Sequence, residues 1–140
     1  MKYRFVLVFK LPAPVPFRAP ADCMPATRGW LSRLRRQVFP VRGTTGECCW
    51  YHGGDWHQVT QLLSAEIRRV NVGRPVLEED DRREVMRGIE ERTPAGWLRS
   101  AALSVLMDPM RASRTGWVNG QHRAQAMIDA GVRQALFEVS

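Results

Sequence analysis

The chain has 140 residues, of which 44% are hydrophobic and 25% charged, and this balance favours one folded domain over an intrinsically disordered chain. Its net charge of +7, with a pI of about 10.3, favours an anionic partner such as nucleic acid, a nucleotide or an anionic surface. All basic residues except Lys2 and Lys10 are arginines, whose planar guanidinium suits phosphate and carboxylate.

Cysteine count and hydropathy bear on the cellular compartment. Three cysteines cannot form a closed disulfide framework, so we expect reduced thiols and a cytoplasmic location. The N-terminus begins like a signal peptide, but its apolar run is short, so residues 4–11 predict a strand. No apolar stretch is long enough to span a bilayer, and we expect no membrane partner.

Prolines and arginines dominate the next segment. Five prolines between Pro12 and Pro25 predict an extended connector, and Thr27 is a candidate cap for a helix that runs to Val38. The apolar stripe of this helix would be Trp30, Leu31, Leu34 and Val38. Its arginines, largely off the stripe, are Arg28, Arg33, Arg35 and Arg36. They could line a nucleic-acid backbone or form a solvated face, and both interpretations stay open.

Residues 41–54 are rich in glycine and predict a loop or hairpin. The residue types of zinc ligands occur here as Cys48, Cys49 and His52, and just beyond the segment as His57. Their spacing fits no standard zinc pattern, so we predict no metal centre while leaving the question open.

Residues 55–58 have the form of a capping box and predict a helix to Arg69. Its apolar side would be Val59, Leu62, Leu63 and Ile67.

The second half alternates short elements. Residues 70–77 are extended, and residues 78–92 predict a helix with an acidic start and a basic end. Val85, Met86 and Ile89 would face inward. Strands are predicted at 101–107, 116–119 and 134–139, a loop at 108–115 and a helix at 121–130. The whole is a small α+β fold.

One stretch stands out chemically, where residues 116–119 lead through Asn119-Gly120 into the helix 121–130. The amides at a helix N-terminus lack intrahelical partners and, with the helix dipole, favour an anion. Gly120 would allow close approach of a phosphate, Arg123 would bind it and His122 could donate or move a proton. Gln121 and Gln125 would face away from the core. The alternative is a simple turn with surface side chains.

Residues 117–126 resemble the phosphate-binding motif of the ParB/sulfiredoxin superfamily. They read Trp117-Val118-Asn119-Gly120-Gln121-His122-Arg123-Ala124-Gln125-Ala126, and the superfamily's Asp-Gly-Gln-His-Arg variants are the most similar in sequence. Asn71-Val72-Gly73-Arg74-Pro75 and the helix after it are similar to the first ParB box. The resemblance covers about 66–140 and implies a mixed sheet with packed helices. Residues 1–65 would be a basic N-terminal segment, either separate or part of the same domain.

The resemblance implies a phosphate site made of Asn119, Gly120, Gln121, His122, Arg123 and Arg74. Its ligand would be a nucleotide, such as a nucleoside triphosphate with Mg²⁺, or a nucleic-acid backbone, in a DNA-associated role. Asn119 stands where the nearest variants have Asp, and Gln121 where sulfiredoxin has its reactive Cys, so sulfinic-acid reduction is not expected.

Two alternatives stay open. The first is a small-molecule kinase or nucleotide hydrolase that would use an acidic residue of 78–81 as base. Its candidate catalytic residues are Glu78, Glu79 and His122. The resemblance implies this region, because the superfamily's kinases carry a catalytic Glu there. The same carboxylates could simply stabilise a helix start. A non-catalytic interaction subunit would instead dock on a protein partner, or on a second copy of the chain, through the helix 27–38 and the proline connector.

Overall fold

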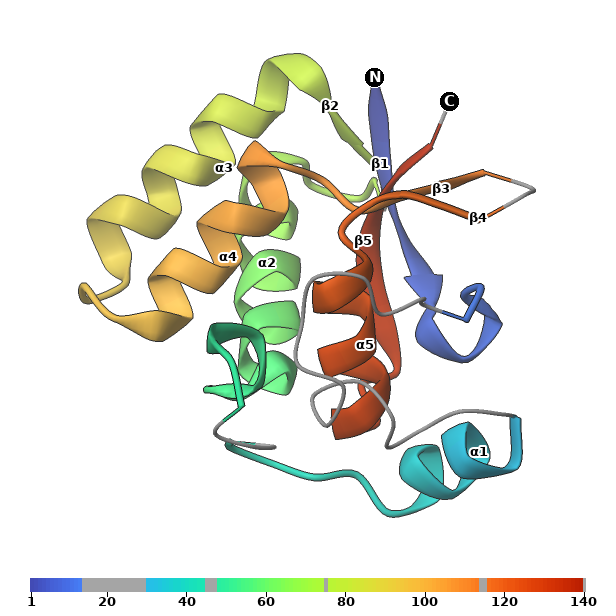
Figure 1. Cartoon of the computed structure of the whole chain (residues 1–140). Helices are drawn as coiled ribbons and strands as arrows, with labels where there is room; N and C mark the ends of the chain where they lie inside the picture. The colour runs from blue at the N-terminus through green and yellow to red at the C-terminus, as the bar shows by residue number, and fades with distance from the viewer. Residues whose placement is uncertain (14–29, 45–47, 75, 114–115, 140) are drawn as a thin grey trace.

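The structure is a computed structural model that describes residues 1–13, 30–44, 48–74, 76–113 and 116–139. Most of the proline connector, the candidate cap Thr27 and the candidate nucleic-acid contact Arg28 lie outside these ranges. The protein is a small α+β fold, as predicted (Figure 1).

The elements follow one another as β1 (Lys2–Leu7), η1 (Val8–Lys10), α1 (Trp30–Val38), η3 (Trp50–His52), α2 (Trp56–Val70), β2 (Val76–Glu78), α3 (Glu79–Arg92), α4 (Trp97–Met107), β3 (Arg111–Ser113), β4 (Gly116–Asn119), α5 (Gln121–Ala130) and β5 (Gln134–Val139).

The main sheet has the strand order β2-β1-β5, and both pairings are antiparallel. Tyr3 of β1 lies opposite Leu77 on one side and Glu138 on the other. A second, two-stranded sheet joins β3 to β4, and a bridge from Met110 to Phe137 links the two sheets. Because β1 is the central strand, the N-terminal segment and residues 66–140 share one sheet.

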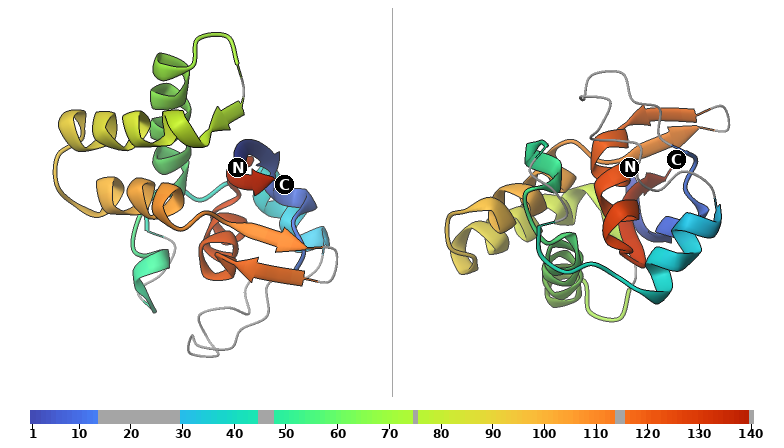
Figure 2. Two further views of the ribbon diagram at one scale, coloured as in Figure 1. Left: turned by 90° about the horizontal axis from the view of Figure 1, so that it is seen from above. Right: turned by 60° about the horizontal axis from the view of Figure 1, so that its bottom comes forward.

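Three helices pack against one another on one side of the molecule, where α2 contacts both α3 and α4, and α3 runs beside α4 (Figures 1 and 2). The helix α2 starts as predicted, because the Asp55 carboxylate accepts hydrogen bonds from the amides of His57 and Gln58. Val59, Leu63 and Ile67 of α2 are buried and Leu62 is partly buried. In α3, Val85 and Ile89 are buried and Met86 is partly buried.

The strand predicted at 101–107 is wrong, because these residues form most of α4. A short apolar run does not by itself distinguish a buried strand from a buried helix. Its fully buried members are Ala101, Ala102, Val105 and Leu106, which recur at helical spacing. Alanine, leucine and methionine also favour helix over strand. The predicted loop 108–115 contains the short strand β3.

The orientation predicted for α1 is also wrong. The stripe residues expected in the core are exposed, with Trp30 at 63% and Leu31 at 65%. Arg33, expected on a basic outer face, is buried and donates to the carbonyl oxygens of Leu11 at 2.5 Å and Phe9 at 3.4 Å. The face of α1 that carries Arg33 therefore turns inward, where backbone carbonyls accept the hydrogens of its guanidinium.

Among the described residues, no helix combines the length and the apolar character needed to cross a membrane.

Candidate functional site

The turn that begins α5 has the predicted bounds, with β4 ending at Asn119 and α5 starting at Gln121. Gly120 between them is left-handed, with φ of 79°. A Cβ on Gly120 would lie 2.5 Å from Cγ of Met110, inside van der Waals contact. The fold therefore requires glycine here for its backbone conformation and for packing, whether or not a phosphate binds.

An aspartate holds the polar side chains of this turn. Asp108 accepts a hydrogen bond from the Asn119 amide on one carboxylate oxygen. Its other oxygen lies 3.2 Å from Nη2 of Arg123. Asn119 also donates to the carbonyl of Pro109 at 3.1 Å, and Arg123 Nη1 donates to the carbonyl of Ser104 at 2.6 Å. Asp108 thus places a carboxylate beside the side-chain amide of Asn119.

Arg123 is 5% exposed, whereas the side chain of Asp108 is 68% exposed. Burial lowers the pKa of the Arg123 guanidinium, and the negative charge of Asp108 opposes this shift. An arginine keeps its proton through such shifts, so the pair presents a fixed cation beneath a solvent-facing carboxylate. Sequence reasoning missed Asp108, which it treated only as the start of a loop. The Asp-Pro pair directly after α4 is the one local signal for it.

A pocket of about 450 Å³ opens beside this turn, and we call it the turn pocket. Two aromatic residues of η3, Trp50 and Tyr51, line it together with Asp108 and Arg123. Its remaining lining residues are Ser100, Leu103, Ser104 and Met107 of α4. The pocket therefore combines an aromatic and aliphatic surface with two hydroxyls, one carboxylate and one buried guanidinium.

The other motif residues do not line the turn pocket. His122 is partly buried, and its ring packs against that of Tyr51 with centroids 5.5 Å apart. Gln121 is partly exposed. Gln125, expected to face away from the core, is instead 2% exposed and donates to Asp129 at 2.8 Å, because an i,i+4 amide–carboxylate bond satisfies both groups inside.

Arg74, the remaining residue of the predicted phosphate site, lies elsewhere. It lines a second pocket of about 540 Å³ with Arg4 and Arg68, which we call the basic pocket. Its other lining residues are Phe5, Ser64, Ile67, Val76 and Gln134. The three arginines are exposed, and no ion pair between them and a carboxylate is found in the part of the chain that the structure describes. The two pockets share no lining residue.

The acidic residues 78–81 are at the start of α3 and do not line the turn pocket. Glu79 accepts a hydrogen bond from the Tyr3 hydroxyl at 2.6 Å and pairs with Arg82. The Tyr3 hydrogen bond is the main cause that lowers the pKa of Glu79, while burial and Glu79 together raise the pKa of Tyr3 to about 12. Glu78 is exposed at the end of β2. The structure does not bring either candidate base to Arg123 or His122.

The predicted nucleic-acid contacts on α1 are also dispersed. Arg33 is buried against backbone carbonyls, so it is not available to a phosphate backbone. Arg35 is exposed and Arg36 is half-buried. These two arginines alone, among the described residues of the predicted set, retain access to solvent.

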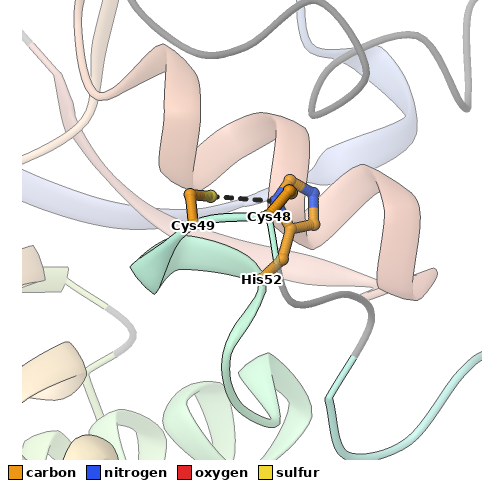
Figure 3. A group of neighbouring side chains, drawn as sticks. All are labelled: Cys48, Cys49 and His52. Carbon is orange, nitrogen blue, oxygen red and sulfur yellow. Dashed lines mark hydrogen bonds between the residues drawn. The ribbon is translucent and has the colours of Figure 1, made fainter.

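Cys48, Cys49 and His52 bring their ligand-type atoms within 4.8 Å of one another (Figure 3). Cys48 is in a disulfide, which corrects the expectation of reduced thiols for this residue and removes its sulfur as an anionic ligand. His57 lies apart, with Nε2 at 2.9 Å from the carbonyl of Ala130 and 3.1 Å from that of Val41. Cys49 and His52 then remain, fewer than the four donors of a structural zinc site.

Comparison of the chain with protein-family models, with curated proteins and with solved structures gives no match.

Proposed function

We propose that the protein binds a nucleotide in the turn pocket, in a DNA-associated role. The observation that carries this proposal is that the motif's Arg123 lines one pocket with the aromatic side chains Trp50 and Tyr51. The base would stack on the aromatic side, and the phosphate would meet the guanidinium of Arg123. The resemblance of residues 117–126 to phosphate-binding motifs and the net charge of +7 support the same ligand class.

The size and lining of the turn pocket suit this ligand. Small-molecule sites generally have volumes of roughly 300–1,000 Å³ and are mostly apolar with a few well-placed polar groups. Stacking of a base on an aromatic side chain contributes about 1–3 kcal/mol. Arg123 uses only some of its five N–H donors on Ser104 and Asp108, so it is held in place and still has donors for a phosphate.

Asp108 makes binding dependent on a divalent cation. Its carboxylate lies beside Arg123 and would repel a bare triphosphate. Mg²⁺ binds carboxylate and phosphate oxygens together, so it would join Asp108 to the ligand. The exposed side of Asp108 leaves room for such a bridge. We propose no reaction, because the acidic residues 78–81 do not line this pocket.

Isothermal titration with ATP and CTP, with and without Mg²⁺, tests the proposal. Trp50→Ala should weaken binding by about tenfold or more, since it removes one stacking surface. Trp30→Ala is the matched control, because Trp30 is an exposed tryptophan of α1 that does not line the turn pocket. Asp108→Asn should abolish the dependence on Mg²⁺. Equal affinities for all three variants and the wild type would reject the turn pocket as the site.

The basic pocket favours a second candidate function, contact with a nucleic-acid backbone. Three exposed arginines without carboxylate partners among the described residues meet there. Binding of a duplex should then fall steeply as salt rises, because phosphate contacts release counterions. Arg68→Gln should reduce this salt slope by about one, whereas nucleotide capture in the turn pocket should be unaffected.

A further inference from the structure

A line of three polar side chains lies outside both pockets. Cys49 precedes η3, His52 ends it, and Asp129 belongs to α5, far away in the sequence. His52 Nδ1 is 3.2 Å from Cys49 Sγ, and His52 Nε2 is 2.8 Å from Asp129 Oδ2 (Figure 3 shows the cysteines with the imidazole). A thiol, an imidazole and a carboxylate in this order form the arrangement that activates nucleophiles in proteins.

The hydrogen bonds set which imidazole nitrogen can take a proton. The Asp129 carboxylate accepts from His52 Nε2, so that nitrogen carries the hydrogen and the lone pair lies on Nδ1, which is nearer to Cys49 Sγ than to the disulfide-bonded Cys48 Sγ at 3.5 Å. Gln125 donates to the other oxygen of Asp129 at 2.8 Å and fixes the orientation of the carboxylate. The Asp129 hydrogen bond raises the pKa of His52, and burial opposes this rise. The raised pKa makes His52 a better acceptor for the thiol proton.

Access to this site is restricted on one side. His52 and Asp129 are 5% and 6% exposed, whereas Cys49 is half-buried and is a free thiol. Of the three residues, Cys49 is the one with partial solvent exposure, while His52 and Asp129 are shielded from water. Because Cys49 itself is half-buried, a small electrophile can approach it more readily than a large substrate can.

We propose that Cys49 is a reactive thiol, with His52 as its base and Asp129 as the residue that positions the base, and that it reduces small hydroperoxides. His52 Nδ1 takes the thiol proton, and the sulfur attacks the terminal oxygen of the hydroperoxide. The S–O bond forms as the O–O bond breaks, and the leaving alkoxide takes the proton from His52. Cys49 is oxidised by two electrons to a sulfenic acid and the hydroperoxide is reduced to an alcohol, or to water when it is hydrogen peroxide.

The full chain, kept oxidised so that the disulfide of Cys48 stays intact, tests the reactivity. Iodoacetamide labelling at pH 7 is followed by peptide mass spectrometry, with fragmentation to assign the label to Cys49. His52→Gln should slow labelling about tenfold, and Asp129→Asn should slow it several-fold. His57→Gln is the matched control and should leave the rate unchanged, since the His57 ring lies at the backbone carbonyls of Val41 and Ala130 and not at Cys49. Circular dichroism confirms that each variant is folded.

A labelling rate that does not fall in His52→Gln would indicate a purely structural hydrogen bond. If the imidazole only shields the sulfur, His52→Gln will label at the same rate or faster, and the proposal is overturned. A second measurement does not depend on the His52 variant. Hydrogen peroxide followed by dimedone should add one dimedone to Cys49 of the wild type and much less to Asp129→Asn. Absence of the adduct in the wild type, or equal adducts in both proteins, would also overturn the proposal.

Discussion

Replacement of Gly120 by alanine should destabilise the protein through two separable effects. The left-handed backbone of Gly120, with φ of 79°, costs an L-residue about 1–2 kcal/mol. The new Cβ would lie 2.5 Å from Met110 Cγ and 3.0 Å from Met110 Cα, and forcing a methyl into a packed site costs about 1–3 kcal/mol. The free energy of unfolding should therefore fall by about 2–5 kcal/mol, which corresponds to a Tm lower by roughly 10 °C in a chain of this size.

A second glycine separates the two effects. Gly73 has φ of 80°, but a Cβ there would meet no atom of the described residues within 4 Å. Gly73→Ala should therefore lose only the backbone cost, about 1–2 kcal/mol. Urea unfolding of both variants, followed by circular dichroism, gives the comparison.

Equal losses in the two variants would refute the reasoning, because they would mean that Met110 does not constrain position 120. A further check is Gly120→Ala combined with Met110→Ala. Removal of the Met110 side chain should make the Gly120 substitution less costly than it is in the wild type, and additive losses would contradict the contact.

Two further predictions concern buried charged groups. Arg33→Ala should lower the free energy of unfolding by about 1–3 kcal/mol, because it removes the donor to the buried carbonyl of Leu11. Arg35→Ala, on the exposed side of α1, should change it by about 0.5 kcal/mol at most. Urea unfolding measures both variants, and a larger loss for Arg35→Ala would contradict the observed orientation of α1. Glu66 is buried and its pKa is lowered, mainly by the Arg92 hydrogen bond, so its contribution is present above its ordinary pKa near 4.5 and is lost as pH falls. The stability difference between wild type and Glu66→Gln should shrink below about pH 4.5, and a difference that is constant with pH would argue against this linkage.

The sequence predicts most helices well because their signals are local. The α2 cap at Asp55, the acidic start of α3 and the Gly131 that ends α5 all act within one helical turn. The strand β5 was likewise recognisable from its own composition. Such features can be read without knowing what lies next to them in space.

Other features depend on partners that are distant in sequence. Nothing near Arg33 indicates that carbonyls of residues 9 and 11 will accept its hydrogens, and this contact reverses the expected orientation of α1. The helix α4 was predicted as a strand because its short apolar run suits either structure until the helices that surround it are known.

The candidate site shows the same division. The turn from Asn119 to Arg123 was predictable with its bounds, but the residues that complete its pocket come from η3 and α4. Asp108 and Trp50 line the turn pocket only because the fold brings η3 and the end of α4 next to Arg123. Arg74 was grouped with the turn by the resemblance, yet β2 and α2 carry it to the basic pocket.

A crystal structure grown with Mg²⁺ and ATP tests the central claim most directly. Nucleotide capture predicts a base against Trp50 and Tyr51, a phosphate at Arg123, and Mg²⁺ between the phosphate and Asp108. Nucleotide density at Arg4, Arg68 and Arg74, or a turn pocket that stays empty at saturating ATP, would contradict it.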